Sequence, residues 1–312
     1  MSQDNIEEEE ADVSLSCCCA SCGKAEIDHI KLVPCDDCDL VKYCSDECQE
    51  DHRSQHEEAC KKRAAELRDE LLFKQPESSH LGDCPICCLP IPLDKSKSTL
   101  KSCCSKIICN GCWYANQIRE QEARLVQSCP FCRKRAPPKT EEEYYKLLMK
   151  RVKANDPVAM RREGGKQYDK GDYSSAFEYW TKAAAFGDAE AHCRLARFSV
   201  EGQGVEKDEG MAIHHAEEAA IGGHPVARHN LGGHEMDYND NAERAMKHWV
   251  IAATQGHDES IKMLMDTYKK GLAKKDDFGA ALRAHKAAVD ATKSPQREVA
   301  DEFYRYWDSI SL

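Results

Sequence analysis

Long apolar segments are missing from this sequence. Its 312 residues are 41% hydrophobic and 32% charged, and no apolar run approaches the ~18 residues that a membrane helix requires. We therefore expect no membrane-spanning segment. The chain has material for about two ordinary domains.

Basic charge is also scarce. The chain has 44 lysines and arginines against 55 aspartates and glutamates, so its formal net charge is −11. An acidic surface repels a phosphate backbone, and nucleic-acid binding normally requires a basic patch. We expect no nucleic-acid partner. One small basic cluster is interpreted as a solvated linker: Arg133, Lys134, Arg135 and Lys139.

Cysteine is almost absent from the second half of the chain. After residue 132 there is only Cys193, whereas the other 18 of the 19 cysteines lie before residue 133, mostly in C-x-x-C pairs. Each such pair can supply two thiolates to one zinc ion. A disulfide scaffold would need an oxidising compartment and normally a signal peptide, but the N-terminus carries the acidic run Glu7–Glu10 instead. We expect zinc sites in an intracellular protein, cytoplasmic or nuclear.

The first cysteine series has a regular spacing, and Tyr43 stands before its fifth cysteine. The series runs Cys19-x-x-Cys22, Cys35-x-x-Cys38, Cys44-x-x-x-Cys48 and His56-x-x-x-Cys60. Residues 17–60 thereby resemble the MYND zinc-finger family. The resemblance implies two interleaved zinc sites. One would use Cys19, Cys22, Cys44 and Cys48, and the other Cys35, Cys38, His56 and Cys60.

A spacing of four residues places the last part of this module on one face of an expected helix. The residues on that face are Cys48, His52, His56 and Cys60. The family pattern selects His56 as the ligand, so His52 is interpreted as a surface residue or a support for a ligand. Cys17 and Cys18 are interpreted as spare. The resemblance implies binding of proteins, often of short proline-containing peptides; the alternative is a purely structural module.

Residues 61–80 are expected to form a charged helix, up to about Lys74, and a linker. A second cysteine series follows in residues 81–135. Its members are Cys84-Pro-Ile-Cys87, Cys103-Cys104, Cys109-x-x-Cys112 and Cys129-Pro-Phe-Cys132. This order resembles a RING finger. The resemblance implies one zinc ion on Cys84, Cys87, Cys109 and Cys112. A second would bind Cys129, Cys132 and Cys104, but Lys106 stands at the usual histidine position, so Cys103 is expected to substitute.

Three residues match positions that matter for activity in RING-type ubiquitin ligases. Ile86 and Pro130 correspond to the docking surface for a ubiquitin-conjugating enzyme, and Arg133 to a cation that orients the linked ubiquitin. Such a module positions its partners and has no nucleophile of its own. Trp113 heads an expected helix that runs to about Val126, and its side chain is interpreted as core.

From about residue 155 a short repeat dominates the sequence. The pattern A-x-x-x-W-x-x-A-A-x-x-G spans Ala176–Gly187 and Ala245–Gly256, and Ala212–Gly223 has alanine in place of tryptophan. A degenerate fourth copy surrounds Ala281. The units resemble Sel-1-like repeats, relatives of tetratricopeptide repeats, which implies a helical solenoid. Trp180 and Trp249 are expected in its core. The first helix of each unit is expected to start near Ala159, Ala191, Ala227 and Ser260.

The end of the chain forms one apolar helical stripe, which we interpret as a cap on the last repeat. A docking helix for another protein is the alternative. The stripe contains Val299, Phe303, Tyr306, Trp307 and Ile310. Several repeat histidines are interpreted as solvent-facing and not as a metal site. They are His214, His215, His224, His229 and His234.

The sequence therefore predicts a mainly α-helical protein with two small zinc modules before a solenoid of about four repeats. A disordered acidic tail (1–15) precedes them, a linker (136–154) follows the second module, and repeats with a C-terminal capping helix fill 155–312. Pro137-Pro138 suggests independence of the second module from the repeats. The favoured function is a zinc-binding interaction protein that acts as a RING-type ubiquitin ligase or ligase adaptor, its substrates selected by the repeats and the MYND finger. The alternative is a non-enzymatic scaffold, and the oligomeric state stays open.

Overall fold

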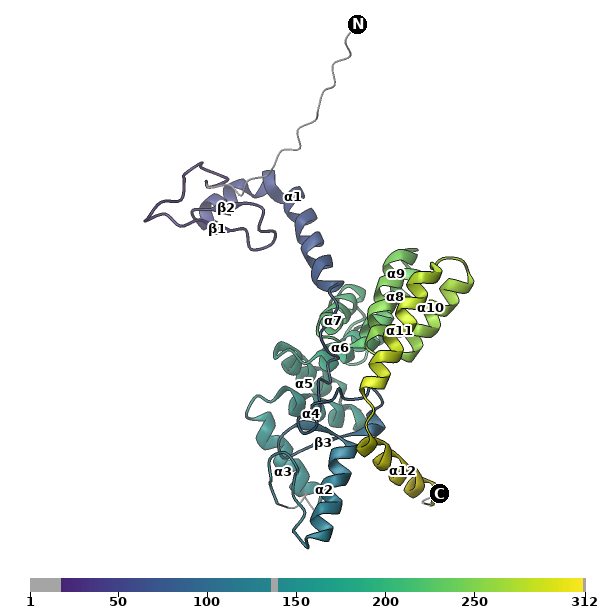
Figure 1. Ribbon diagram of the computed structural model, residues 1–312. Helices are drawn as coiled ribbons and strands as arrows, with labels where there is room; N and C mark the ends of the chain where they lie inside the picture. Colours follow the sequence, from purple (N-terminus) through teal and green to yellow (C-terminus); the bar gives the residue numbers. More distant parts are fainter. Residues whose placement is uncertain (1–17, 136–139, 311–312) are drawn as a thin grey trace. The chain divides into compact units, whose positions relative to one another are not determined.

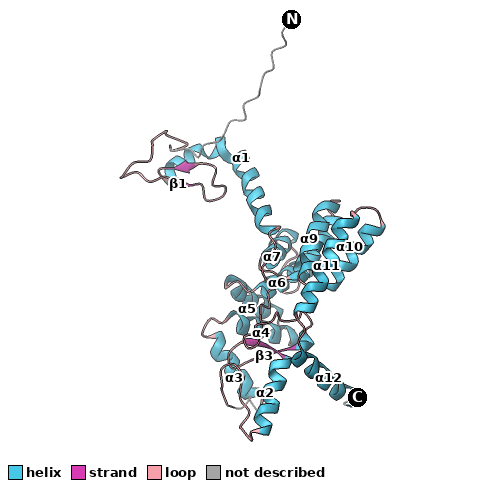
Figure 2. Ribbon diagram, viewed as in Figure 1, coloured by secondary structure: helices cyan, strands magenta, loops and turns pink. Residues whose placement is uncertain are grey.

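The computed structural model describes residues 18–135 and 140–310, and these form twelve α-helices and four short strands (Figure 2). The expectations for the tail, Cys17, Lys139 and the Ile310 side chain lie outside the described residues. The independence of the second module from the repeats, suggested by Pro137-Pro138, is wrong, because both belong to the same compact unit. The chain divides into two compact units, Met1–Leu72 and Phe73–Leu312. Within the described parts, no helix combines the length and apolarity that crossing a membrane requires.

The first unit is a small hairpin followed by one long helix. Strand β1 (Val33–Pro34) pairs antiparallel with β2 (Lys42–Tyr43). Helix α1 (Asp46–Leu72) then runs for 27 residues, because no proline or glycine interrupts it. The helix expected up to about Lys74 is thus the second half of α1. The main buried cluster of this unit consists of Cys19, Leu32, Cys35, Cys38 and Tyr43, so thiols form much of its core.

The second unit starts with another cysteine-rich hairpin. A 3-10 turn, η1 (Lys95–Lys97), leads into β3 (Ser98–Lys101), which pairs antiparallel with β4 (Lys106–Cys109). Helix α2 (Asn110–Glu122) follows directly, and Cys109 caps its first turn by accepting a hydrogen bond from the Cys112 N–H. The helix ends four residues before the predicted Val126.

Helix pairs build the solenoid, and Figure 1 shows them in succession along the chain. The pairs are α4 (Pro157–Asp169) with α5 (Tyr173–Ala185), α6 (Ala189–Glu201) with α7 (Glu209–Ile221), α8 (Pro225–Asp237) with α9 (Ala242–Thr254), and α10 (Asp258–Lys269) with α11 (Lys275–Ala291). Gly187, Gly223 and Gly256 have positive φ after the second helix of three pairs, a conformation that glycine adopts without strain. The predicted repeat architecture is therefore confirmed.

The two repeat tryptophans are fully buried, as predicted, and glycine makes room for them. Trp180 lies against Gly164 of the partner helix in its own pair, where a Cβ would come within 2.5 Å of the indole Nε1. Trp249 meets Gly232 in the same way. Each Nε1–H donates to a backbone carbonyl 3.1 Å away, of Arg161 and His229 respectively. The glycines thus let a large ring pack between the helices of one unit.

Two other segments differ from the prediction. Residues 136–154, assigned to a linker, contain helix α3 (Glu141–Val152), which packs on α4 and is capped by Thr140. Helix α12 (Pro295–Ile310) packs against α2 of the second module and does not cap the last repeat as expected. The reason lies in its aromatic residues: Phe303 contacts the Tyr114 ring at 4.7 Å between centroids, and the Tyr304 hydroxyl contacts Gln117.

Candidate metal centres

The structure brings the cysteines of both modules into four compact groups. In each group the potential ligand atoms lie within 4.8 Å of one another. Site I consists of Cys19, Cys22, Cys44 and Cys48; site II of Cys35, Cys38, His56 and Cys60; site III of Cys84, Cys87, Cys109 and Cys112; site IV of Cys103, Cys104, Cys129 and Cys132. In both modules the two sites alternate along the chain, so each site ties together segments that are distant in sequence.

The distances in the first module fit a tetrahedral metal ion. In site I, the Sγ atom of Cys44 lies 3.5 Å from that of Cys22 and 3.6 Å from that of Cys48. In site II, Cys35 and Cys60 are 3.7 Å apart. Zinc–sulfur bonds of ~2.3 Å in a tetrahedron place two sulfurs ~3.8 Å apart, whereas a disulfide would need ~2.05 Å. All eighteen described cysteines are free thiols.

One histidine of α1 faces site II and its neighbour does not. His56 is buried, and its Nε2 lies 3.1 Å from the Cys38 Sγ. Burial lowers the pKa of His56, with a smaller contribution from His52, which favours the neutral ring that binds metals. His52 instead contacts the Tyr43 hydroxyl through Nδ1 at 3.1 Å and stacks on the His56 ring. It supports the ligand and does not belong to the site.

The cysteine doublet of the second module faces a single site. Cys103 and Cys104 have their Sγ atoms 4.0 Å apart, and these lie 3.4 Å from Cys132 and 3.9 Å from Cys129 respectively. The tight β3–β4 turn, in which Ser105 has a φ of 53°, lets both side chains point the same way. Lys106 is exposed, with its Nζ 5.9 Å from the centroid of the Phe131 ring, and takes no part in site IV.

The thiols of site III are close enough to share protons. A hydrogen bond from Cys109 lowers the pKa of the Cys84 thiol to about 4, despite burial. The same contact, together with burial, raises the pKa of Cys109 far above its usual range. A divalent ion would replace the shared protons and stabilise all four thiolates together. The group therefore has the donor chemistry of a structural zinc site.

The predicted docking residues of the second module reach solvent to different extents. The Ile86 side chain is 40% exposed, Arg133 is exposed with a φ of 58°, and Pro130 is half-buried. Phe131 is 42% exposed, and the sequence analysis missed it. The signal was present, because Phe131 stands in the C-P-F-C pair where Ile86 stands in C-P-I-C.

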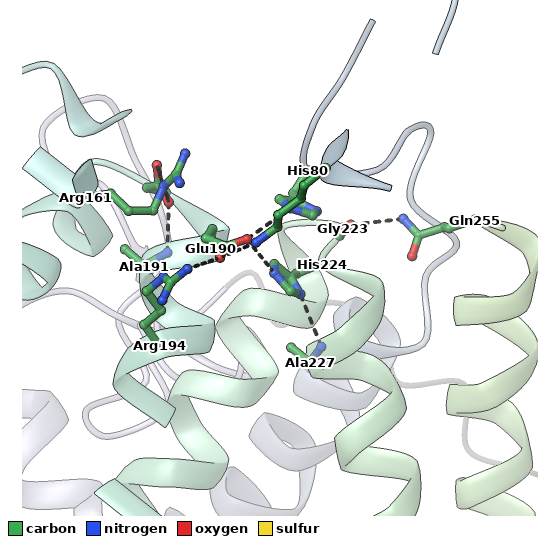
Figure 3. Close-up of polar contacts among 11 residues, drawn as sticks. His80, Arg161, Glu190, Ala191, Arg194, Gly223, His224, Ala227 and Gln255 are labelled. Atoms are coloured by element: carbon green, nitrogen blue, oxygen red, sulfur yellow. Dashed lines mark hydrogen bonds and ion pairs between the residues drawn. The ribbon is translucent and has the colours of Figure 1, made fainter. Parts of the chain in front are cut away.

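A fifth group was not foreseen, since its members are far apart in sequence. His80, Glu190 and His224 place their ligand atoms within 4.8 Å of one another (Figure 3). His224 was interpreted as solvent-facing, but it is buried, and its ring stacks on that of His80 at 4.1 Å. Burial would raise the pKa of Glu190, but contacts with His224 and His80 hold it far below its usual range.

This fifth group fits an ion-pair node better than a metal site. The Nδ1 of His224 accepts a hydrogen bond from the Ala227 backbone N–H, which places a ring proton on Nε2, 3.3 Å from Glu190. A metal ion would need that nitrogen free of its proton. Lys95 and Arg194 also lie 3.1 and 2.9 Å from the other oxygen of Glu190. The backbone N–H of His80 also donates to the Gly223 carbonyl at 2.9 Å. Together, these contacts attach the first residues of the second module to the solenoid.

Comparison with protein families assigns two parts of the chain. Residues 19–60 match the MYND finger, and residues 158–188, 189–224 and 226–257 match the Sel1 repeat. The chain therefore contains a MYND finger, which implies zinc binding, and three Sel1 repeats; α10 and α11 form a further helix pair beyond the matched residues. Both families are protein-interaction modules.

The relatives resemble only part of the chain. Chitin synthase regulatory factor 4 of Schizosaccharomyces pombe is 36% identical over 87 residues, which are 28% of this chain and 14% of that protein. A Sel1 repeat protein from Oxalobacter formigenes is 22% identical, with a TM-score of 0.41 over 55% of this chain and 50% of that one. A protective antigen of uropathogenic Escherichia coli with an SLR fold is 20% identical, with a TM-score of 0.38 over 62% and 40%.

Proposed function

We propose that the second module recruits a ubiquitin-conjugating enzyme, so that the protein acts as a RING-type ubiquitin ligase or as the adaptor of one. The observation that carries this proposal is the pair of C-P-x-C loops, each of which exposes an apolar side chain, Ile86 and Phe131. Exposed apolar side chains on a metal-braced loop cost little to order when a partner covers them. Arg133 follows the last cysteine and is exposed, as a cation that contacts a bound ubiquitin must be.

In this proposal the other modules choose the substrate. The MYND finger and the solenoid bind peptide segments of target proteins, and the node around Glu190 keeps the second module against the repeats. We propose four zinc ions per chain, two in each module. An intracellular location, cytoplasmic or nuclear, fits the free thiols.

One contact favours a non-enzymatic scaffold as the second candidate. Helix α12 packs on α2 and covers part of it, with Phe303 against Tyr114 and the Gln296 side chain on Gly111. A conjugating enzyme that required this face of α2 would be excluded. The module would then serve only as the joint between two sets of binding surfaces.

An autoubiquitination assay separates the two candidates. Zinc-loaded full-length protein is incubated with a panel of conjugating enzymes, beside Ile86→Ala, Phe131→Ala and Arg133→Ala. Val126→Ala is the matched control, because Val126 is an exposed apolar residue of the same module outside the C-P-x-C loops. Ubiquitin chains that disappear in the three variants and persist in the control support the ligase. A fully metallated protein that forms no chains with any enzyme contradicts it and leaves the scaffold.

The number of zinc ions is tested separately by elemental analysis of protein purified without chelator. Four ions per chain agree with sites I to IV. Two ions would mean that the second module is not metallated, and the proposed recruitment would lose its basis.

A further inference from the structure

Arg297, in the first turn of α12, is buried against the second zinc module. Its side chain is 6% exposed. One terminal nitrogen donates to the carbonyls of Pro90 and Thr292, each at 2.7 Å. The other donates to the Leu89 carbonyl at 3.1 Å and contacts the Sγ of Cys87 at 3.3 Å. A residue at the end of the chain thus touches a potential metal ligand 210 positions earlier.

This guanidinium has no carboxylate partner among the residues that the structure describes. Arginine keeps its charge under all ordinary conditions, and a buried charge without a countercharge is costly. Four thiolates around one Zn²⁺ carry a net charge of −2, since −4 + 2 = −2. Site III, to which Cys87 belongs, would therefore supply the missing negative charge.

The backbone of α12 also approaches the ligand loop closely. A Cβ at Gly111 would lie 2.9 Å from the Arg297 Cγ and 3.0 Å from its Cα, so only glycine permits this contact. Gly111 stands between the potential ligands Cys109 and Cys112, and its carbonyl accepts a hydrogen bond from Gln296 at 3.2 Å. Lys97 holds the next turn of α12 through Asp301 at 2.6 Å.

From these contacts we infer that Arg297 is a positioning residue of site III. Its guanidinium neutralises the tetrathiolate zinc site, orients the Cys84–Cys87 loop through Leu89 and Pro90, and so couples zinc binding to the docking of α12. The inference rests on the proposed zinc binding by the second module. It predicts that the C-terminal helix is part of this metal centre, although the cysteines that build it all lie between residues 84 and 112.

The test asks whether the charge or the length of the side chain at position 297 is required, and it uses the full-length protein. Arg297→Met keeps a long side chain without charge, and Arg297→Lys keeps the charge. Arg305→Met is the control, because Arg305 is an exposed arginine of the same helix whose Nε bonds only within α12. Zinc release to a chromogenic chelator and the sulfur-to-cobalt charge-transfer band of the Co²⁺-loaded protein are recorded for each variant.

We expect Arg297→Met to bind one zinc ion about 10- to 100-fold more weakly than the unaltered protein, as outer-shell changes at metal sites do, to release it faster to the chelator, and to shift the charge-transfer band. Arg297→Lys should restore most of both properties, and Arg305→Met should change neither. Coupling is reciprocal, so Cys84→Ser should in turn release α12, seen in the fluorescence of Trp307.

Three outcomes would overturn the inference. Unchanged zinc release in Arg297→Met would reduce Arg297 to a packing residue. Equal losses in Arg297→Met and Arg297→Lys would exclude the countercharge. An undisturbed Trp307 signal in Cys84→Ser would deny the coupling. By contrast, an unaltered protein that holds only two zinc ions would refute metal binding by the second module itself, and the proposed function with it.

Discussion

The cysteine modules and the repeats are stabilised in different ways. A module of about 45 residues cannot bury enough apolar surface to hold itself together, and three of the five residues in the buried cluster of the first unit are cysteines. The solenoid buries Trp180, Phe198, Trp249 and many alanines. It needs no metal, because each unit covers the apolar face of the next. Stability should therefore depend on zinc in one part of the chain and on side-chain fit in the other.

The two modules also differ from each other. The first is complete within residues 18–72, since its ligands and the supports Tyr43 and His52 all lie there. The second module contacts other parts of its unit at two places. Arg297 and Gln296 of α12 contact its Cys87 and Gly111, and His80 contacts Glu190 of the repeats. The first should behave as an independent unit, whereas loss of the second should disturb the end of the chain.

Zinc removal should have the largest effect. We expect a strong chelator to unfold both modules, because structural zinc contributes about 10 kcal/mol or more per site, while the solenoid keeps its helices. The four tryptophans allow this to be measured: Trp180 and Trp249 are in the repeats, and Trp113 and Trp307 in the second module and α12. Single-tryptophan proteins should show large fluorescence changes for the second pair only. Equal changes in all four would mean that the repeats depend on zinc too.

A change of one ligand should sharpen the contrast between the two modules. His56→Ala should remove one zinc ion and loosen the first module, because site II loses a buried ligand, without an effect on the fluorescence of Trp113 or Trp307. His52→Ala is the matched control on the same helix face and should keep the full complement of zinc. The reverse result, with loss of zinc only in His52→Ala, would make His52 the ligand.

The sequence predicted those features that depend on local spacing. The resemblance of the cysteine spacings to the MYND and RING families implied the same four groups that the structure brings together, and the repeat pattern placed Trp180 and Trp249 in the core. The prediction failed for α12, where the stripe residues Val299, Tyr306 and Trp307 are exposed. The buried residues are Arg297 and Ala300 instead, because an apolar stripe does not determine which surface a helix packs on. Arg297 and Glu190 could not be found either, since a single charged residue carries no spacing signal and their partners lie about 30 to 210 positions away.

Neighbouring glycines test the fit of the repeats. Gly164→Ala would place a Cβ 2.5 Å from the Trp180 Nε1, and overpacking of this kind costs about 1–3 kcal/mol. Gly165→Ala is the matched control, because nothing lies within 4 Å of its Cβ; it should gain about 0.5–1 kcal/mol from higher helix propensity. Chemical unfolding followed by Trp180 fluorescence measures both. Equal effects would show that the ring does not depend on the missing Cβ, and Gly232 with Gly233 repeats the comparison around Trp249.

The smallest expected effect is on the stability of the repeats at acidic pH. It depends on whether an aspartate or a histidine caps the first helix of a repeat. Asp156 and Asp188 cap α4 and α6, whereas His257 caps α10 by accepting the Ser260 N–H at Nδ1. Burial, with help from His229, lowers the pKa of His257 to about 4. A histidine in the unfolded chain titrates near 6.5. Between pH 6.5 and 4 the unfolded chain therefore binds more protons than the folded one, and stability falls as the pH falls.

Replacing this histidine cap by an aspartate, as at α4 and α6, should weaken this dependence. We expect His257→Asp to lose less thermal stability than the unaltered protein between pH 7 and pH 4.5, by a few degrees in Tm, because its carboxylate stays ionised over most of that range. Both proteins carry Trp113→Phe and Trp307→Phe, so that only the repeats report. His29→Asn removes an exposed histidine from the first unit and should leave the slope unchanged. If His257→Asp shows the full loss, proton uptake by this cap does not govern the acid response of the repeats.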